Sequence, residues 1–212
     1  MLQEKDSVSI TNVSVVFDSH MKFEGQVSSI CKASFFHNRN TSRIRKYLSV
    51  ENTRTLVHAF VTCRLDNGNA LLYGLPKYLI AKLQVVLNCA ARLILCKEKY
   101  DHATPLLIQL HWLPVSQRII FKILLFTFKA FNGLAPTYIT ELLDRYVPPR
   151  PLRSSSRGLL KVPRSNTKYG DRSFSVCAPT LWNSLPDHLR LTTDRCSFKR
   201  DLKTYLFRES FD

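Results

Sequence analysis

Acidic residues are scarce in this chain, and the few present are scattered. The 212 residues include 16 Asp and Glu against 31 Lys and Arg, a net charge of +15, and no two acidic residues are adjacent. Metal-dependent phosphoryl or nucleotidyl transfer needs carboxylates close enough to share cations. Glu141 and Asp144 stand one helical turn apart beside Arg145, which is typical of a solvated helix face. The sequence therefore argues against a two-metal centre.

Glycine is also rare, with six residues dispersed singly. None of the G-x-x-x-x-G-K-S/T, G-x-G-x-x-G and G-x-S-x-G patterns occurs, so no recognised loop is available to cradle a phosphate or to expose a nucleophile. No Ser or Cys is marked by a local catalytic signature. We therefore predict that the chain as it stands is not an enzyme, has no catalytic residue, and needs no cofactor or small-molecule substrate.

The six cysteines do not form a metal-binding pattern. Cys89 and Cys96, with His102 and His111 further on, are the nearest approach to a zinc set. On one helix the two thiols would lie about 10.5 Å apart along the axis, too far for one tetrahedral ion. Core thiols are the favoured interpretation, with no metal site. Scattered cysteines and the absence of a secretory signal at residues 1–7 indicate a cytoplasmic or nuclear protein.

The chain has no apolar run of the ~20 residues that a membrane span requires. Its most apolar stretch, residues 111–136, reads as a helix that begins near Pro114, ends before Gly133 and is buried on nearly every side. Lys122 and Lys129 would lie in hydrocarbon if this helix crossed a bilayer. We therefore expect no membrane partner.

Arg118 joins Lys122 and Lys129 in the narrow polar sector of that helix. The residues leave two interpretations of this stripe open. It is either the edge of a nucleic-acid surface or the side of a core helix that meets water.

The fold class predicted from hydrophobic periodicity is mostly α. We expect a helical array with a short N-terminal β-strand pair and a basic, loop-rich C-terminal segment that ends in a helix. The strand pair occupies residues 8–17 and turns near Asn12, and it requires a larger sheet supplied from upstream or elsewhere.

Several elements follow from the same periodicity. A helix from Phe23 would bury Val27, Ile30, Cys31 and Phe35; one capped by Ser49 would carry Leu56, Phe60 and Cys63; and one after Pro76 would bury Leu79, Ile80, Leu83, Val86, Leu87, Ala90, Ala91, Leu93 and Ile94. Residues 159–162 and 173–177 read as short strands, the second leading into a helical turn at 178–182. The final helix, after Ser197, would bury Phe198, Leu202, Tyr205 and Leu206.

Changes in composition divide the chain into four parts. We expect strands at residues 1–20, a helical domain at 21–144, a basic Pro/Ser-rich linker or arm at 145–177, and a helical segment at 178–212. The arm holds eight basic residues against the single acid Asp171. It is the clearest change in composition along the chain.

The basic arm is the candidate site. Cations recur every three or four residues, with Tyr146, Tyr169 and Phe174 interleaved as stacking groups, and the final helix adds three more cations on its outer face. The candidate nucleic-acid-binding residues are Arg150, Arg153, Arg157, Lys161, Arg164, Lys168, Arg172, Lys199, Arg200 and Lys203. The alternative is a solvated connector that is basic because the whole chain is basic.

Five blocks make the sequence resemble a known family. They are AFVTCRLDNGNALLYGLP (59–76), LQVVLNCAARLI (83–94), HATPLLIQLHWLPVSQRIIFKILLFTFKAFNGLAPTYI (102–139), LRSSSRGLLKVPR (152–164) and YGDRSFSVCAPTLWNSLPDHLR (169–190). This succession resembles the C-terminal region of LINE-type (non-long-terminal-repeat) retrotransposon reverse transcriptases, and NVSVVFDSHMKFEGQVSSICK resembles the segment just after their palm.

The resemblance implies a specific division of the chain. Residues 1–20 would be the last palm strands, residues 21–144 a helical thumb, and the remainder a segment that contacts nucleic acid. The family's Tyr-x-Asp-Asp carboxylates have no counterpart here. The implied function is RNA or DNA binding without catalysis, with the upstream polymerase region as a further partner. A helical protein-interaction scaffold and an inert genomic remnant are the alternatives.

Overall fold

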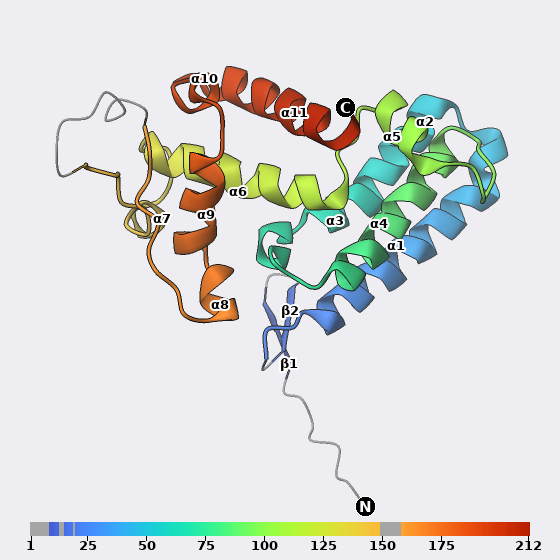
Figure 1. The fold of residues 1–212 in the computed structure, drawn as a ribbon. Helices are drawn as coiled ribbons and strands as arrows, with labels where there is room; N and C mark the ends of the chain where they lie inside the picture. Colours follow the sequence, from blue (N-terminus) through green and yellow to red (C-terminus); the bar gives the residue numbers. More distant parts are fainter. Residues whose placement is uncertain (1–8, 13–14, 19, 149–157) are drawn as a thin grey trace, which may run out of the picture. The chain divides into compact units, whose positions relative to one another are not determined.

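A computed structural model describes residues 9–12, 15–18, 20–148 and 158–212 of the chain (Figure 1). The mostly helical fold is confirmed, as are the N-terminal strand pair and the C-terminal helix. The chain divides into two compact units, Met1–Ser116 and Gln117–Asp212. This division lies at the start of the most apolar helix, whereas the composition of the sequence led us to expect a boundary at residue 144.

The strand pair is an antiparallel hairpin, as predicted. It consists of β1 (Ser9–Asn12) and β2 (Val15–Asp18) and turns after Asn12. The backbone N–H of Val16 donates to Oε1 of the buried Gln26 at 2.9 Å, which ties the hairpin to the helix that follows. Within the described residues no further strand joins this sheet.

The remainder of the first unit is helical. Its elements are α1 (Glu24–Ile44), the 3₁₀ turn η1 (Arg45–Tyr47), α2 (Val50–Val57), the π turn η2 (His58–Thr62), α3 (Cys63–Asp66), the 3₁₀ turn η3 (Asn69–Leu72), α4 (Lys77–Ile94) and α5 (Ala103–Gln109). Ser49 caps α2 as predicted, accepting a hydrogen bond from the Asn52 N–H. Most of the predicted face of α4 is buried, namely Leu79, Leu83, Val86, Leu87, Ala90, Ala91 and Ile94.

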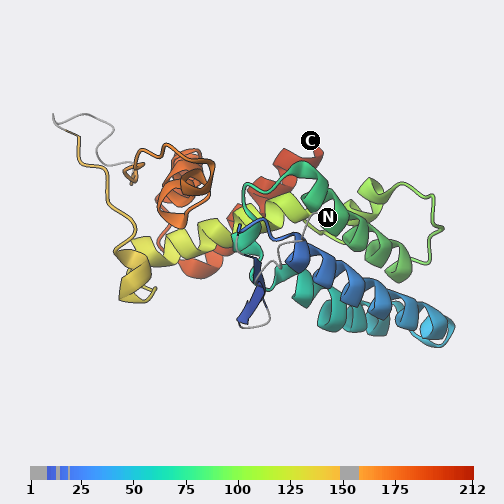
Figure 2. The ribbon, with the colours of Figure 1, turned by 90° about the horizontal axis from the view of Figure 1, so that it is seen from below.

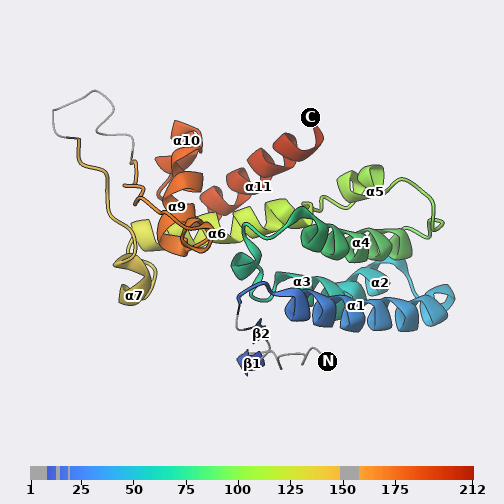
Figure 3. The same cartoon turned by 60° about the horizontal axis from the view of Figure 1, so that its bottom comes forward.

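Helices α1 and α4 lie alongside each other and run in the same direction (Figures 2 and 3). Near their starts, the Tyr78 hydroxyl donates to Oε1 of Glu24 at 2.6 Å. Near their ends, the Arg45 guanidinium donates to the carbonyls of Leu93 and Ile94, both at 3.0 Å. The Arg45 side chain thereby satisfies carbonyls that the end of α4 leaves without a partner in the helix.

Two predicted helix faces in this unit are wrong in part. On α1, Phe35 is exposed, and Ser34, Asn38 and Thr41 are buried instead, because the buried face continues along the row of Val27 and Ile30. Around η2, the predicted Phe60 and Cys63 are exposed, and Val57, Val61 and Leu65, which recur every four residues, are buried. Around η2, apolar spacing alone does not distinguish the row Leu56, Phe60 and Cys63 from the row Val57, Val61 and Leu65.

The second unit contains most of α6 (Val115–Phe131) and the helices that follow it. These are α7 (Thr137–Thr140), α8 (Lys168–Asp171), α9 (Phe174–Asn183), α10 (Asp187–Arg190) and α11 (Arg195–Phe211). Helix α6 begins directly after Pro114, and Gly133 takes a φ of 67° just past its end, as predicted. Every position from 117 to 131 is buried or half-buried. The predicted burial on nearly every side is correct only in part, because Ile120, Phe121, Phe126 and Phe131 are half-buried. In the part of the chain that is described, no helix combines the length and apolarity needed to span a bilayer.

Stacked aromatic rings form the core of the second unit. Phe128 of α6 stacks on Phe198 of α11 with ring centroids 4.2 Å apart, and Trp182 of α9 lies 5.8 Å from Phe198 and 5.5 Å from Phe131. Phe128, Trp182 and Phe198 are fully buried. This packing unites α6 with the C-terminal helices, which is why the unit boundary lies in the first turn of α6.

The predicted strand at residues 173–177 is wrong. These residues start α9, and the carbonyl of Ser173 accepts from the N–H of Cys177 at 2.9 Å, a helical hydrogen bond. The helical turn expected from residue 178 therefore begins one turn earlier, and Cys177 is buried. Of the predicted strand at 159–162, only Leu160 forms a bridge, with Arg145.

Candidate nucleic-acid interface

Where the basic arm begins, residues 144–146 are hydrogen-bonded to residues 159–161 within it. The N–H of Tyr146 donates to the carbonyl of Leu159 at 3.0 Å, and the N–H of Lys161 donates to that of Asp144 at 2.9 Å. These bonds flank the antiparallel bridge between Arg145 and Leu160. The chain thus enters and leaves residues 149–157 at one place on the second unit.

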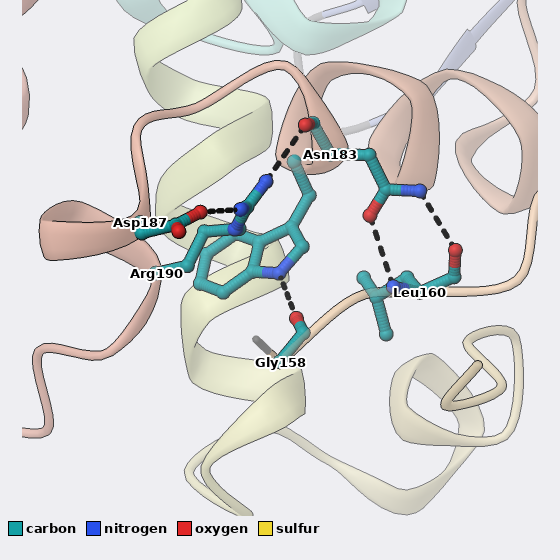
Figure 4. A network of polar contacts seen from close by, with 6 residues as sticks. Gly158, Leu160, Asn183, Asp187 and Arg190 are labelled. Carbon is teal, nitrogen blue, oxygen red and sulfur yellow. Dashed lines mark hydrogen bonds and ion pairs between the residues drawn. The ribbon is translucent and has the colours of Figure 1, made fainter. Parts of the chain in front are cut away.

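Side chains of α9 hold residues 158–160 of the arm in place (Figure 4). The Trp182 indole N–H donates to the Gly158 carbonyl at 2.8 Å. Asn183 pairs with Leu160 in both directions: its Oδ1 accepts from the Leu160 N–H at 2.9 Å, and its Nδ2 donates to the Leu160 carbonyl at 2.8 Å. The amide of Asn183 therefore acts as a second strand would, on the side of Leu160 opposite Arg145.

Arg190 is structural, although it is basic and close to the arm. Its guanidinium is buried, donates to the carbonyl of Asn183 at 2.7 Å and forms an ion pair with Asp187 (Figure 4). It satisfies the C-terminal end of α9. We therefore place it outside the candidate interface.

The predicted arm residues fall into three groups. Arg150, Arg153 and Arg157 lie outside the described residues. Three predicted cations of the arm are exposed, namely Lys161, Arg164 and Lys168. Arg172 is half-buried. Of the predicted stacking groups, Tyr146 and Tyr169 are exposed and Phe174 is half-buried.

The predicted outer face of α11 is confirmed. Lys199, Arg200 and Lys203 are exposed, whereas Phe198, Leu202 and Leu206 are buried. The helix begins three residues earlier than expected because Asp194 caps it, accepting from the Ser197 N–H at 2.7 Å. This hydrogen bond lowers the pKa of the Asp194 carboxyl. Arg200 is paired with its neighbour Asp201 at 3.1 Å.

Arg118 of α6 belongs with the lysines of α11. Partial burial lowers the pKa of Lys203, and the positive charges of Arg118 and Lys199 lower it further. Lys203 therefore lies close enough to Arg118 of α6 and to Lys199 of its own helix for both positive charges to act on it. We call Arg118, Lys199 and Lys203 the basic cluster.

The other lysines of the α6 stripe have an aromatic neighbour. Lys122 Nζ lies 5.8 Å and Lys129 Nζ 6.0 Å from the ring centroid of Phe126, one turn away on either side. Both lysines are half-buried. Their stems cover the helix while the ring attracts the charged ends.

Sequence reasoning named Arg118 only in the α6 stripe, which it left open as a nucleic-acid edge or a water-facing side, and not among the candidate residues of the arm and final helix. The signal was present, because Arg118 stands one turn before Lys122 on the polar side of α6. What the sequence did not provide was the packing of α6 on α11, which brings Arg118 beside Lys203.

Among the described side chains, no group of three or more His, Cys, Asp or Glu is arranged to hold a metal ion. Comparisons of the chain with protein-family models, with curated proteins and with solved structures found no match.

Proposed function

We propose that this chain binds RNA or DNA through the basic surface of its second unit, without catalysing a reaction. In this proposal it is the thumb and tail of a LINE-type reverse transcriptase, the family that its sequence resembles. The observation that supports the proposal most is the basic cluster. Partial burial and the positive charges of Arg118 and Lys199 disfavour the charged form of Lys203, and a polyanion that binds there favours it.

The mode of binding in this proposal is contact with the phosphate backbone. Lysine and arginine neutralise phosphates and release counterions, and such contacts carry no sequence information. The exposed rings of Tyr146 and Tyr169 supply faces on which unpaired bases stack. Hydrogen bonds pair residues 144–146 with residues 159–161 of the arm, next to this surface. Such a protein would act in the cytoplasm or the nucleus.

The test is a titration of the full chain with a single-stranded RNA and a duplex DNA at several salt concentrations. The logarithm of affinity should fall linearly with the logarithm of salt concentration. The triple variant Arg153→Gln, Arg157→Gln, Arg164→Gln should bind more weakly than the wild type. Affinity that ignores salt, or that survives the triple change, contradicts the proposal.

A helical protein-interaction scaffold is the second candidate, and it is favoured by an apolar groove of about 370 Å³ between α1 and α4, lined by Cys31, Phe35 and Val85 among others. In that case the chain has no more affinity for nucleic acid than an unrelated protein of similar net charge. The same titration, run beside such a control protein, separates the two functions.

A further inference from the structure

Helices α1 and α4 form an apolar groove in the first unit. The groove has a volume of about 370 Å³, and its walls are almost wholly apolar. The lining residues come from one turn after another of the two helices: Ser28, Cys31, Lys32 and Phe35 on α1, and Lys82 and Val85 on α4. Because α1 and α4 run in the same direction, the groove follows both helices.

The apolar side chains of the groove are incompletely covered. Phe35 remains 39% exposed and Val85 51% exposed. Single exposed apolar residues are common on protein surfaces. A concave apolar site of this volume, in contrast, has the geometry of a binding site.

Lysines without carboxylate partners border the groove. No ion pair is found for Lys32 or Lys82 among the described residues, and Lys82 Nζ instead lies 5.6 Å from the Tyr78 ring centroid. Glu24 is the only acidic residue of α1, α4 has none, and the Glu24 carboxylate accepts from Tyr78. The border of the groove is therefore positive, with little negative charge from its own helices.

The chemistry of the groove defines the occupant that fits it. We propose that the α1/α4 groove binds an amphipathic helix that presents large apolar side chains to Phe35 and Val85 and carboxylates to Lys32 and Lys82. A bare polyanion satisfies only the lysines and leaves the apolar walls in water. A helix in a groove satisfies both.

Cys31 provides a reporter inside the groove. Burial raises the pKa of its thiol, and the charge of Lys82 opposes that rise, so thiol and ammonium lie near each other. Cys63 and Cys96, in the same unit, are exposed. A segment bound in the groove shields Cys31 from an alkylating reagent and leaves Cys63 and Cys96 reactive.

The experiment uses fluorescein-labelled helical peptides of about five turns and the full chain. One peptide carries Leu at i, i+3, i+4 and i+7 with Glu on both flanks, and the control peptide has Lys in place of every Glu. The Glu-flanked peptide should bind more tightly and slow alkylation of Cys31. The variant Lys32→Glu, Lys82→Glu should weaken its binding roughly tenfold and improve binding of the Lys-flanked peptide.

The matched control is Lys46→Glu, Lys97→Glu, which makes the same charge change at exposed positions outside the groove and should bind like the wild type. Equal affinity for both peptides, or unchanged alkylation of Cys31, overturns the proposal. Protection of Cys31 by a single-stranded RNA instead of the peptide also overturns it. Protection is measured on the wild type, so the test holds even if a variant fails to fold. Neutralising the basic cluster should leave peptide binding unchanged, which separates this proposal from nucleic-acid binding.

Discussion

The rings of Phe128 and Phe198 stack at 4.2 Å with only 15° between their planes, and both side chains are fully buried. Arg118 precedes Phe128 on α6, whereas Lys203 follows Phe198 on α11. Because Arg118 and Lys203 also lie close together, the two helices run antiparallel across this stack (Figure 1). An apolar contact thus determines where the basic cluster forms.

Replacing Phe198 with Ala should destabilise the second unit strongly. The change removes a fully buried ring that contacts Phe128 and Trp182, and such truncations lower the free energy of unfolding by roughly 3–5 kcal/mol. Urea unfolding followed by tryptophan fluorescence and circular dichroism measures the change. Tyr138→Ala, at a side chain 69% exposed, is the control and should change stability by less than about 0.5 kcal/mol. Equal effects of the two substitutions would contradict this core.

Replacing Asn183 with Ala should weaken the attachment of the arm to α9 at Leu160. The substitution removes both hydrogen bonds to Leu160 and leaves that N–H and carbonyl without the amide partner, which costs about 1–3 kcal/mol. Hydrogen exchange should accelerate at the amides of Leu160 and Lys161. Thr180→Ala, at an exposed position on α9, is the control and should leave these amides protected. Unchanged exchange in the Asn183 variant would show that the pairing does not hold the arm.

The lowered pKa of Lys203 predicts that the stability of the second unit depends on pH and on salt concentration. Its pKa is lower in the folded chain than the ordinary value of 10.5, so the charged form destabilises the fold at neutral pH. This penalty disappears as pH rises through the folded pKa toward the ordinary value. Lys203→Gln should therefore raise the Tm at neutral pH and low salt, and added salt should reduce the gain. Arg208→Gln, also exposed on α11, is the comparison variant. A lower Tm for Lys203→Gln would mean that Lys203 has a stabilising partner.

Arg45→Lys should destabilise the first unit although it keeps the charge. The guanidinium donates to the carbonyls of Leu48, Leu93 and Ile94 at 2.7, 3.0 and 3.0 Å, and an ammonium on a different stem does not reproduce this planar fork. We expect a loss of about 1–3 kcal/mol in the free energy of unfolding and faster hydrogen exchange at the end of α4. The control is Arg43→Lys, at an exposed position on α1. If the two variants were equally stable, the capping role of Arg45 would be wrong.

Helices with one strong apolar face or clear end signals were predictable from sequence. The buried face of α4 and the limits of α6 follow from apolar spacing, Pro114 and Gly133, all of which are local. The alternation of residues 173–177 predicts a strand, but the same five residues are also compatible with the first turn of a helix. Only the packing of Trp182 against α6 and α11 decides between them.

The candidate sites depend on contacts between distant segments, which the sequence does not supply. The outward direction of Lys199 and Lys203 follows from the period of α11, but their proximity to Arg118 requires the Phe128–Phe198 stack. The α1/α4 groove was missed for the same reason. Lys32 and Lys82 are fifty residues apart, and their common groove results from the parallel packing of two helices.

The most direct test of nucleic-acid binding is the salt dependence of affinity for duplex DNA. Wild type should be compared with Arg118→Gln, Lys199→Gln, Lys203→Gln and with a control, Lys77→Gln, Lys97→Gln, Lys99→Gln, whose three lysines are exposed in the first unit. In a plot of log affinity against log salt concentration, the slope should become shallower by about 0.9 for each lost phosphate contact in the cluster variant. The control should keep the wild-type slope. Identical slopes for the cluster variant and the wild type would contradict the proposed role of this surface.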